Sequence, residues 1–250
     1  MIRGILFDAG ATLLHADPPV EQVYFEAFAR DGARCSPGEL AAALKSTWRE
    51  VRERDVANRF GGATGERGFW ESFVRRARHH LDGGALSDRC FSELVAHFVL
   101  PGSWSVYPDV APALSALRES GFPLAIVSNW DSSLAGLLEA HGLEQGFSAI
   151  LISAVEKTAK PHAEIFHRAC ARLGFRAEEV LHVGDSLEED YRGARAAGLS
   201  ALLLDRDGRH ADVEDRLTTL AELPARPEIS RAESFPRERE SPSAGVRDST

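Results

Sequence analysis

The second half of the chain alternates between short apolar runs and longer segments with the periodicity of an amphipathic helix. From about residue 105 onward, apolar runs predict strands at 124–127, 149–152, 180–183 and 201–204. Segments 109–120, 132–141, 162–173 and 189–197 predict helices, and a glycine follows each of them. Alternating strands and helices with short connections indicate a parallel sheet covered by helices on both faces. The predicted fold class is therefore α/β, with a Rossmann-like sheet.

The first half of the chain has a different pattern. Residues 3–8 form one apolar run that predicts a strand ending on Asp8. Residues 18–100 contain helical patterns at 20–30, 37–55, 66–81 and 87–99, with no convincing strand. We therefore expect a helical insert at 17–100, placed between two parts of one core, 1–16 and 101–223. Residues 224–250 are rich in Pro, Ser, Glu and Arg and predict a disordered tail.

Composition narrows the class of protein. A length of 250 residues with 44% hydrophobic content fits a globular core with a smaller companion. The net charge of −9 argues against a nucleic-acid partner, which needs a basic surface. No apolar run is long enough to span a membrane, and the N-terminus lacks the pattern of a signal peptide, so we expect a cytoplasmic protein. The three cysteines are far apart and predict neither a disulfide framework nor a metal pair.

Polar residues of a particular kind recur at the ends of the predicted strands. Asp8, Ser128 and Asp185 lie at or just past such ends, and Lys160 lies one loop further on. Because ligands of parallel sheets bind beyond the carboxyl ends of the strands, these four side chains can share one crevice. Two carboxylates there repel each other, and a hard cation such as Mg²⁺ relieves the repulsion. Together with a lysine and a hydroxyl, this set of groups suits phosphoryl transfer.

The ordered motifs FDAGATLL, VSN, KP followed by IF, and GDSLEED resemble those of the haloacid dehalogenase-like (HAD) hydrolase superfamily. The resemblance covers roughly residues 1–205, and the helical insert resembles the C1 cap of subfamily I. The stretches VSNWD and HVGDSLEEDYRGARAAG are similar to the group of haloacid dehalogenase-like hydrolase domain-containing protein 3 (REG-2-like). The resemblance implies a Mg²⁺-dependent phosphatase of a small phosphorylated metabolite, acting as a monomer or homodimer.

The resemblance also implies a role for each matching residue. Asp8 would be the nucleophile that forms an aspartyl intermediate. Mg²⁺ would be held by the side chains of Asp8 and Asp185 and by the backbone carbonyl of Gly10. Ser128 and Lys160 would bind the phosphoryl group, with Asn129 beside them; Lys157 is a weaker candidate for the lysine. Asp190 would be a further acidic ligand, directly or through water, and Glu189 is its close rival.

The chain departs from the family pattern at Gly10, where these phosphatases carry a second Asp that protonates the leaving alcohol. A general acid is worth about 10²–10⁴ in rate. Loss of this acid should lower the rate most for sugar phosphates, whose leaving group is an alkoxide, and least for acyl or aryl phosphates. Asp17 or His15 could substitute for the missing acid. Trp130, which follows the VSN motif, either walls the substrate pocket or packs under the cap.

The missing acid leaves two main alternatives to a phosphatase, besides a phosphonatase, whose cap lysine could only be Lys45, more simply explained as a solvated surface residue. One is a 2-haloacid dehalogenase-type hydrolase, which attacks carbon without a metal. This reaction ranks lower because an unneutralised Asp185 beside Asp8 would be costly. The other is a catalytically impaired fold that binds a metabolite or a partner protein.

Overall fold

A six-stranded parallel sheet forms the centre of the computed structural model, which describes residues 1–54 and 65–230. The strand order is β5-β4-β1-β6-β7-β8. Their bounds are β1 Gly4–Phe7, β4 Leu124–Ser128, β5 Ala149–Ile152, β6 Val180–Gly184, β7 Ser200–Leu204 and β8 Arg216–Leu217. The first strand of the chain thus lies between β4 and β6, and the predicted parallel α/β sheet is confirmed.

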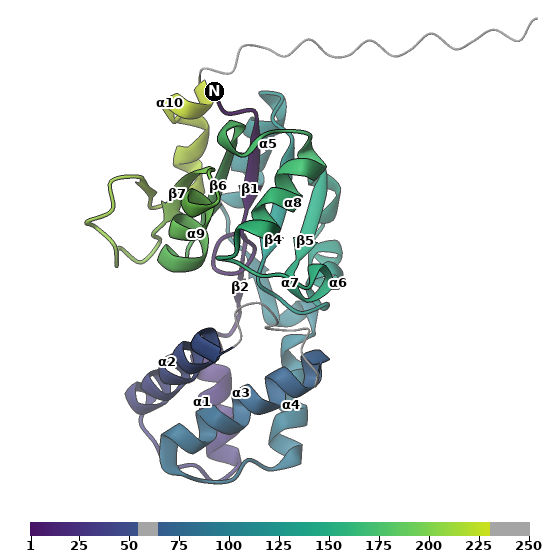
Figure 1. Ribbon diagram of the computed structural model, residues 1–250. Helices are drawn as coiled ribbons and strands as arrows, with labels where there is room; N and C mark the ends of the chain where they lie inside the picture. Colours follow the sequence, from purple (N-terminus) through teal and green to yellow (C-terminus); the bar gives the residue numbers. More distant parts are fainter. Residues whose placement is uncertain (55–64, 231–250) are drawn as a thin grey trace, which may run out of the picture.

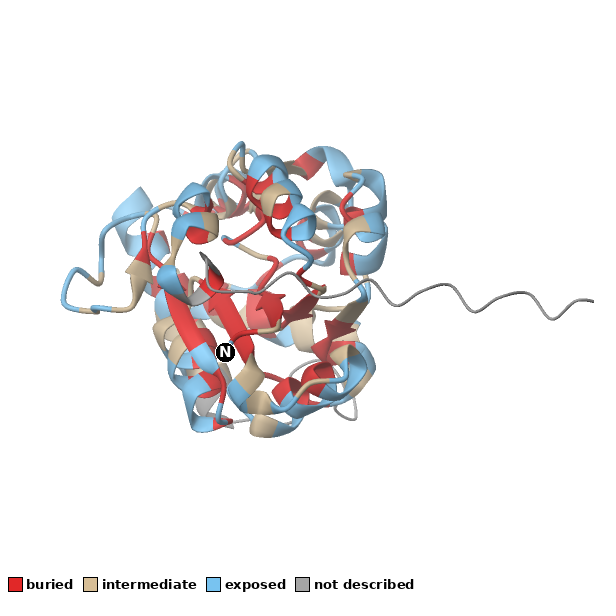
Figure 2. Ribbon diagram, turned by 90° about the horizontal axis from the view of Figure 1, so that it is seen from above, coloured by how far each residue is buried: buried red, intermediate tan, exposed pale blue. Residues whose placement is uncertain are grey.

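Helices cover both faces of this sheet because successive strand residues point to opposite sides. Ile5 and Phe7 of β1 pack with α5 (Val110–Glu119), α6 (Leu134–Ala140) and η5 (Leu220–Ala225). Leu6 packs on the other face, with α8 (Ala163–Leu173) and α9 (Gly193–Ala196). Seen from above, the central strands are almost wholly buried (Figure 2).

The predicted helical insert forms four helices with a core of their own, which we call the cap. They are α1 (Val20–Arg30), α2 (Pro37–Arg54), α3 (Gly65–Asp82) and α4 (Asp88–Phe98). Phe28, Phe73 and Phe91 are buried at their centre, separately from the two clusters that flank the sheet. β1 runs toward this bundle, so the carboxyl ends of the strands face the cap (Figure 1).

A small two-stranded sheet joins the cap to the core. β2 (Leu14–Ala16) pairs antiparallel with β3 (Trp104–Val106), so the two chain segments that enter and leave the cap lie side by side. The sequence did not predict this pair, because three residues are too few to show a strand periodicity. The remaining short helices are η1 (Pro101–Ser103), η2 (Glu144–Gly146), α7 (Ser153–Glu156), η3 (Ala177–Glu179), η4 (Leu187–Arg192) and α10 (Pro227–Ser230).

The predicted tail begins too early. Residues 224 and 225 end η5 and residues 227–230 form α10, and Leu223 and Ile229 are buried against the core. Isolated apolar residues within a polar segment have no periodicity that would reveal this packing. The rest of the predicted tail, residues 231–250, lies outside the described residues. No helix in the described ranges combines the length and apolarity required to cross a bilayer.

Candidate active site

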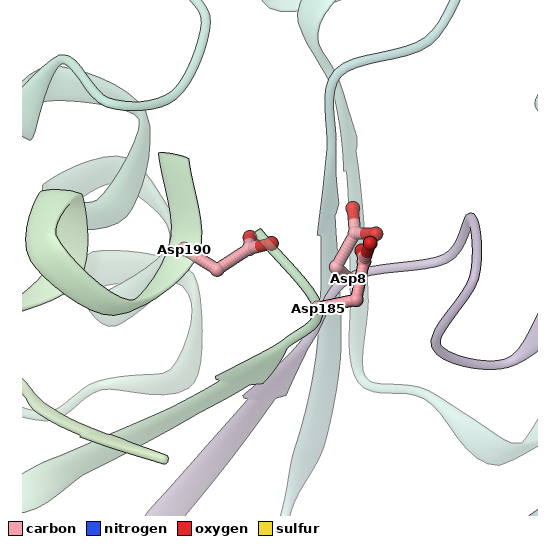
Figure 3. Close-up of side chains that lie close together, drawn as sticks. All are labelled: Asp8, Asp185 and Asp190. Atoms are coloured by element: carbon pink, nitrogen blue, oxygen red, sulfur yellow. The ribbon is translucent and has the colours of Figure 1, made fainter. Parts of the chain in front are cut away.

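The predicted site residues converge at the carboxyl end of the sheet. Asp8 follows β1, Ser128 ends β4, and Asp185 follows β6. Because β4 and β6 both pair with β1, the three strand ends are neighbours. Asp8 and Asp185 lie side by side at the strand tips, and Asp190 points toward them from η4 (Figure 3). Lys160, although it follows no strand, reaches the same place.

Asp8 is held by one of its two carboxylate oxygens. Its Oδ1 accepts hydrogen bonds from the Ser128 hydroxyl at 2.9 Å and from the Lys160 ammonium at 2.6 Å. No described residue donates to Oδ2, which leaves that oxygen available for a ligand. Burial raises the pKa of Asp8 to about 6, against the opposing charge of Lys160.

Lys160 is almost completely buried, with only 1% of its surface exposed. Its Nζ contacts Asp190 Oδ1 at 2.5 Å as well as Asp8. Burial alone would lower its pKa, but the charges of Asp190 and Asp8 raise it above the usual range, so the lysine stays charged. Lys157, the rival lysine, is exposed and has no part in this network.

Asp190 is the most heavily hydrogen-bonded of the three acids. Its Oδ1 also accepts a bond from His182 Nε2 at 2.8 Å, and its Oδ2 accepts one from the Ser186 backbone N–H at 2.9 Å. Despite its burial, the charge of Lys160 and the bond from His182 lower the pKa of Asp190. Gly184 lies so close to this carboxyl group that a Cβ there would collide with it. Asp190 is therefore an anion held in a fixed position, and its carboxylate is paired with the Lys160 ammonium.

The site carries more negative than positive charge. Carboxylate oxygens of Asp8, Asp185 and Asp190 lie within 4.8 Å of one another, whereas Lys160 is the one cation bonded to them among the described residues. Burial and the charge of Asp8 raise the pKa of Asp185 well above its usual value. A hard divalent cation with oxygen ligands would relieve this repulsion, so the donor set fits Mg²⁺. Asp8 and Asp185 have lone pairs available for it, whereas both carboxylate oxygens of Asp190 already accept hydrogen bonds.

Asn129 has a contact that the sequence did not reveal. Its Nδ2 donates to the Lys160 carbonyl at 2.8 Å and to Glu189 Oε2 at 2.7 Å, and its Oδ1 accepts from the Lys160 N–H at 2.8 Å. The amide thus fixes the backbone of Lys160 on both sides. That Asn129 also contacts a phosphoryl group stays a prediction. Glu189, the rival of Asp190, is engaged with Asn129.

Trp130 lies against Gly10, where the second acid of the family pattern would stand. A Cβ on residue 10 would be 3.0 Å from Cζ3 of the indole, closer than ordinary van der Waals contact. Trp130 also lines the cavity and packs against Trp104 in a tilted arrangement, with ring centroids 4.7 Å apart. Of the two interpretations of Trp130, the structure supports the pocket wall.

The two candidate substitutes for the missing acid lie elsewhere. His15 packs on Tyr107, with ring centroids 4.6 Å apart, and Asp17 accepts a bond from Ser105. Neither lines the cavity that contains Asp8. Neither of these two side chains is therefore placed to act for an acid at position 10.

A cavity of about 1040 Å³ lies between this site and the cap. It reaches from Asp8 to residues of α1, α2, α3 and α4. Two sets of hydrogen bonds join its walls. Trp70 Nε1 donates to Asp131 at 2.6 Å, and Glu66 accepts from the hydroxyl of Ser132 at 2.7 Å and from its N–H at 3.2 Å. These contacts hold the start of α3 against the loop that carries Trp130.

Known proteins share both sequence and structure with the chain. The model of the family described as haloacid dehalogenase-like hydrolase matches residues 2–198. Haloacid dehalogenase-like hydrolase domain-containing protein 3 of Danio rerio is 32% identical over 90% of this chain and 96% of its own length. A HAD phosphatase of Thermococcus onnurineus has a TM-score of 0.64 and 28% identity, covering 94% of this chain and 100% of that one. A dehalogenase solved as an intermediate complex has a TM-score of 0.66 and 25% identity, and the match covers 90% of this chain and 96% of the dehalogenase.

Proposed function

The chain belongs to the haloacid dehalogenase-like hydrolase family, and on this premise we propose that it is a Mg²⁺-dependent phosphatase of a small phosphorylated metabolite. The observation that carries the proposal is the arrangement of hydrogen bonds around the carboxylate of Asp8. One oxygen of this carboxylate is held by Ser128 and Lys160, and the other is left without a protein donor among the described residues. A fixed carboxylate with one available oxygen, facing a cavity, suits nucleophilic attack on phosphorus.

The reaction would proceed in two displacements. The available oxygen of Asp8 forms a bond to phosphorus, and the bond between phosphorus and the leaving oxygen breaks, with its electron pair going to the leaving group. Lys160 gives two of its three N–H donors to Asp8 and Asp190 and has the third for an equatorial phosphoryl oxygen. The single hydroxyl hydrogen of Ser128 would turn from Asp8 to a phosphoryl oxygen when the phosphate binds. Water then attacks the aspartyl phosphate, which releases inorganic phosphate and restores Asp8.

Mg²⁺ would be held by Asp8, Asp185 and the backbone carbonyl of Gly10, with Asp190 acting through water. When bound, it neutralises charge on the two acids and on the phosphoryl group. Asp190 has a second task in this proposal. Bound by His182 and Ser186, it keeps the Lys160 ammonium directed at Asp8.

Dehalogenation is the second candidate, because Gly10 provides no general acid and the fold is shared with a dehalogenase. In that reaction Asp8 would attack carbon and halide would leave, with no need for an acid. The position of Asp185 disfavours it. The Asp185 carboxylate, beside the nucleophile, would repel the carboxylate of a haloacid. Without a metal, Asp185 would have no role in this reaction.

The proposal is tested by p-nitrophenol release from its phosphate ester, with Mg²⁺ and with EDTA, for the native protein and Asp8→Asn. We expect hydrolysis by the native protein with Mg²⁺, and a loss of more than about 10³-fold in Asp8→Asn or with EDTA. Thermal unfolding of both proteins serves as the folding control. A folded native protein without Mg²⁺-dependent activity would contradict the proposal, and turnover of 2-chloropropionate without metal would then favour the dehalogenase.

A further inference from the structure

All four tryptophans of the chain line the cavity between the core and the cap. Trp48 comes from α2, Trp70 from α3, Trp104 from β3 and Trp130 from the loop after β4. Each of these side chains is partly buried and keeps some of its surface exposed. Apolar surface that gathers around one hollow and stays exposed there is typical of a ligand site.

The aromatic wall begins beside the reaction centre. Trp130 covers Gly10, two residues from the nucleophile, and Trp104 packs on Trp130. Phe98 follows, with its ring centroid 6.2 Å from that of Trp104. A group bonded directly to the transferring phosphorus would therefore meet an indole ring first.

The cap supplies the opposite end of this wall. Trp48 lies at 6.1 Å from Trp70 and at 4.5 Å from Phe73, measured between ring centroids. The indole N–H groups of Trp70 and Trp104 are bonded to Asp131 and to the Phe98 carbonyl. The polar N–H groups of these two side chains are thus already used within the protein.

Outside the reaction centre, most of the charged groups that line the cavity are exposed. Glu21, Lys45, Arg49 and Arg209 line the cavity and are exposed, whereas Asp131 is partly buried and its carboxylate is occupied by the indole N–H of Trp70. The four exposed groups belong to its solvent side. The inner part of the cavity thus suits an uncharged, flat group.

We infer that the substrate is an aromatic phosphate, with its ring bonded to the phosphate oxygen and packed among the four tryptophans. The inference rests on the proposed phosphatase function and identifies the substrate class. It also accounts for Gly10, because a phenol has a pKa of about 10 and leaves as the phenolate without a general acid. The P–O bond breaks with its electron pair on the aryl oxygen, which takes a proton from water after release.

Two substrates with leaving groups of similar acidity separate recognition from chemistry: phenyl phosphate and 2-naphthyl phosphate. We expect the native protein to prefer the naphthyl ester in kcat/KM by about tenfold or more, because the second ring gains aromatic contacts. Trp48→Leu should reduce that preference by about three- to tenfold, whereas Trp48→Phe should retain most of it. A preference near one, or equal preferences in both variants, would overturn the inference.

Binding without turnover distinguishes this inference from the phosphatase proposal. With Mg²⁺ present, tryptophan fluorescence of the native protein is titrated with 2-naphthyl phosphonate and with n-butyl phosphonate, neither of which is hydrolysed. Tighter binding of the naphthyl compound supports the aromatic site, even if no phosphate ester is cleaved and the phosphatase proposal fails. Hydrolysis of phosphate esters that requires Asp8, with equal binding of the two phosphonates, overturns the aromatic site and leaves the phosphatase standing.

Discussion

The two walls of the cavity have opposite chemistry. On the core side, Asp8, Asp190 and Lys160 are buried, charged and bonded to one another. On the cap side, Trp48 and Trp70 are apolar and partly buried, and the charged side chains of Glu21, Lys45 and Arg49 are exposed. The core wall thus holds a few buried charges in fixed positions, and the cap wall leaves part of its apolar surface exposed.

This difference separates the reaction on the core side from the choice of ligand on the cap side. A buried ion network tolerates little change, because removal of one member leaves the others unpaired in a medium of low dielectric constant. An aromatic wall changes gradually, because each ring adds a modest and similar increment. Substitutions on the core side should therefore affect reaction and stability strongly, and those on the cap side should shift preference among ligands.

The largest effect is expected from Lys160→Met, which leaves Asp8 and Asp190 without their shared cation. The free energy of unfolding in metal-free buffer should fall by about 3–5 kcal/mol. Phosphatase kcat/KM with Mg²⁺ should fall by about 10²–10³-fold. Urea unfolding and steady-state kinetics measure the two effects. Lys157→Met is the matched control, with an expected change within about 0.5 kcal/mol; equal effects of the two substitutions would show that the buried network contributes nothing.

A smaller effect is expected when the missing acid is restored. Gly10→Asp alone should gain little, because its Cβ meets the ring of Trp130. Combined with Trp130→Ala, it should raise the ratio of n-propyl phosphate to phenyl phosphate hydrolysis by about tenfold or more, since a placed acid is worth about 10²–10⁴. The ratio of kcat/KM values is compared with that of Trp130→Ala alone. No difference between these two proteins would refute the idea that the absent acid limits alkyl substrates.

The smallest effect concerns the contact between the walls. Glu66→Ala removes both hydrogen bonds from Ser132 to the start of α3. Bonds to a charged group at an exposed site contribute modestly, so KM for an aryl phosphate should rise by about two- to fivefold, with kcat changed less. Glu71→Ala is the control, because Glu71 pairs with Arg75 inside the cap. If both variants show the same KM, the bonds between the walls do not contribute to substrate binding.

Much of the core was predictable from local patterns. The apolar runs and helical segments determined the parallel sheet and the covering helices, because side-chain periodicity follows directly from strand and helix geometry. Asp8, Ser128 and Asp185 were predicted to meet because each stands where a parallel strand ends. Their convergence needs only the strand order, with β1 between β4 and β6.

Contacts between distant segments were decided by tertiary structure alone. The sequence left Trp130 with two interpretations, and it gave no sign that Asn129 spans the backbone of Lys160. Nor did it show that tryptophans at 48, 70, 104 and 130 border one cavity. Periodicity reports which face of an element is buried, but the partner on that face depends on how whole elements pack. The sequence by itself therefore determined the elements and the reactive strand ends, while the packing of cap against core decided the shape and apolarity of the cavity.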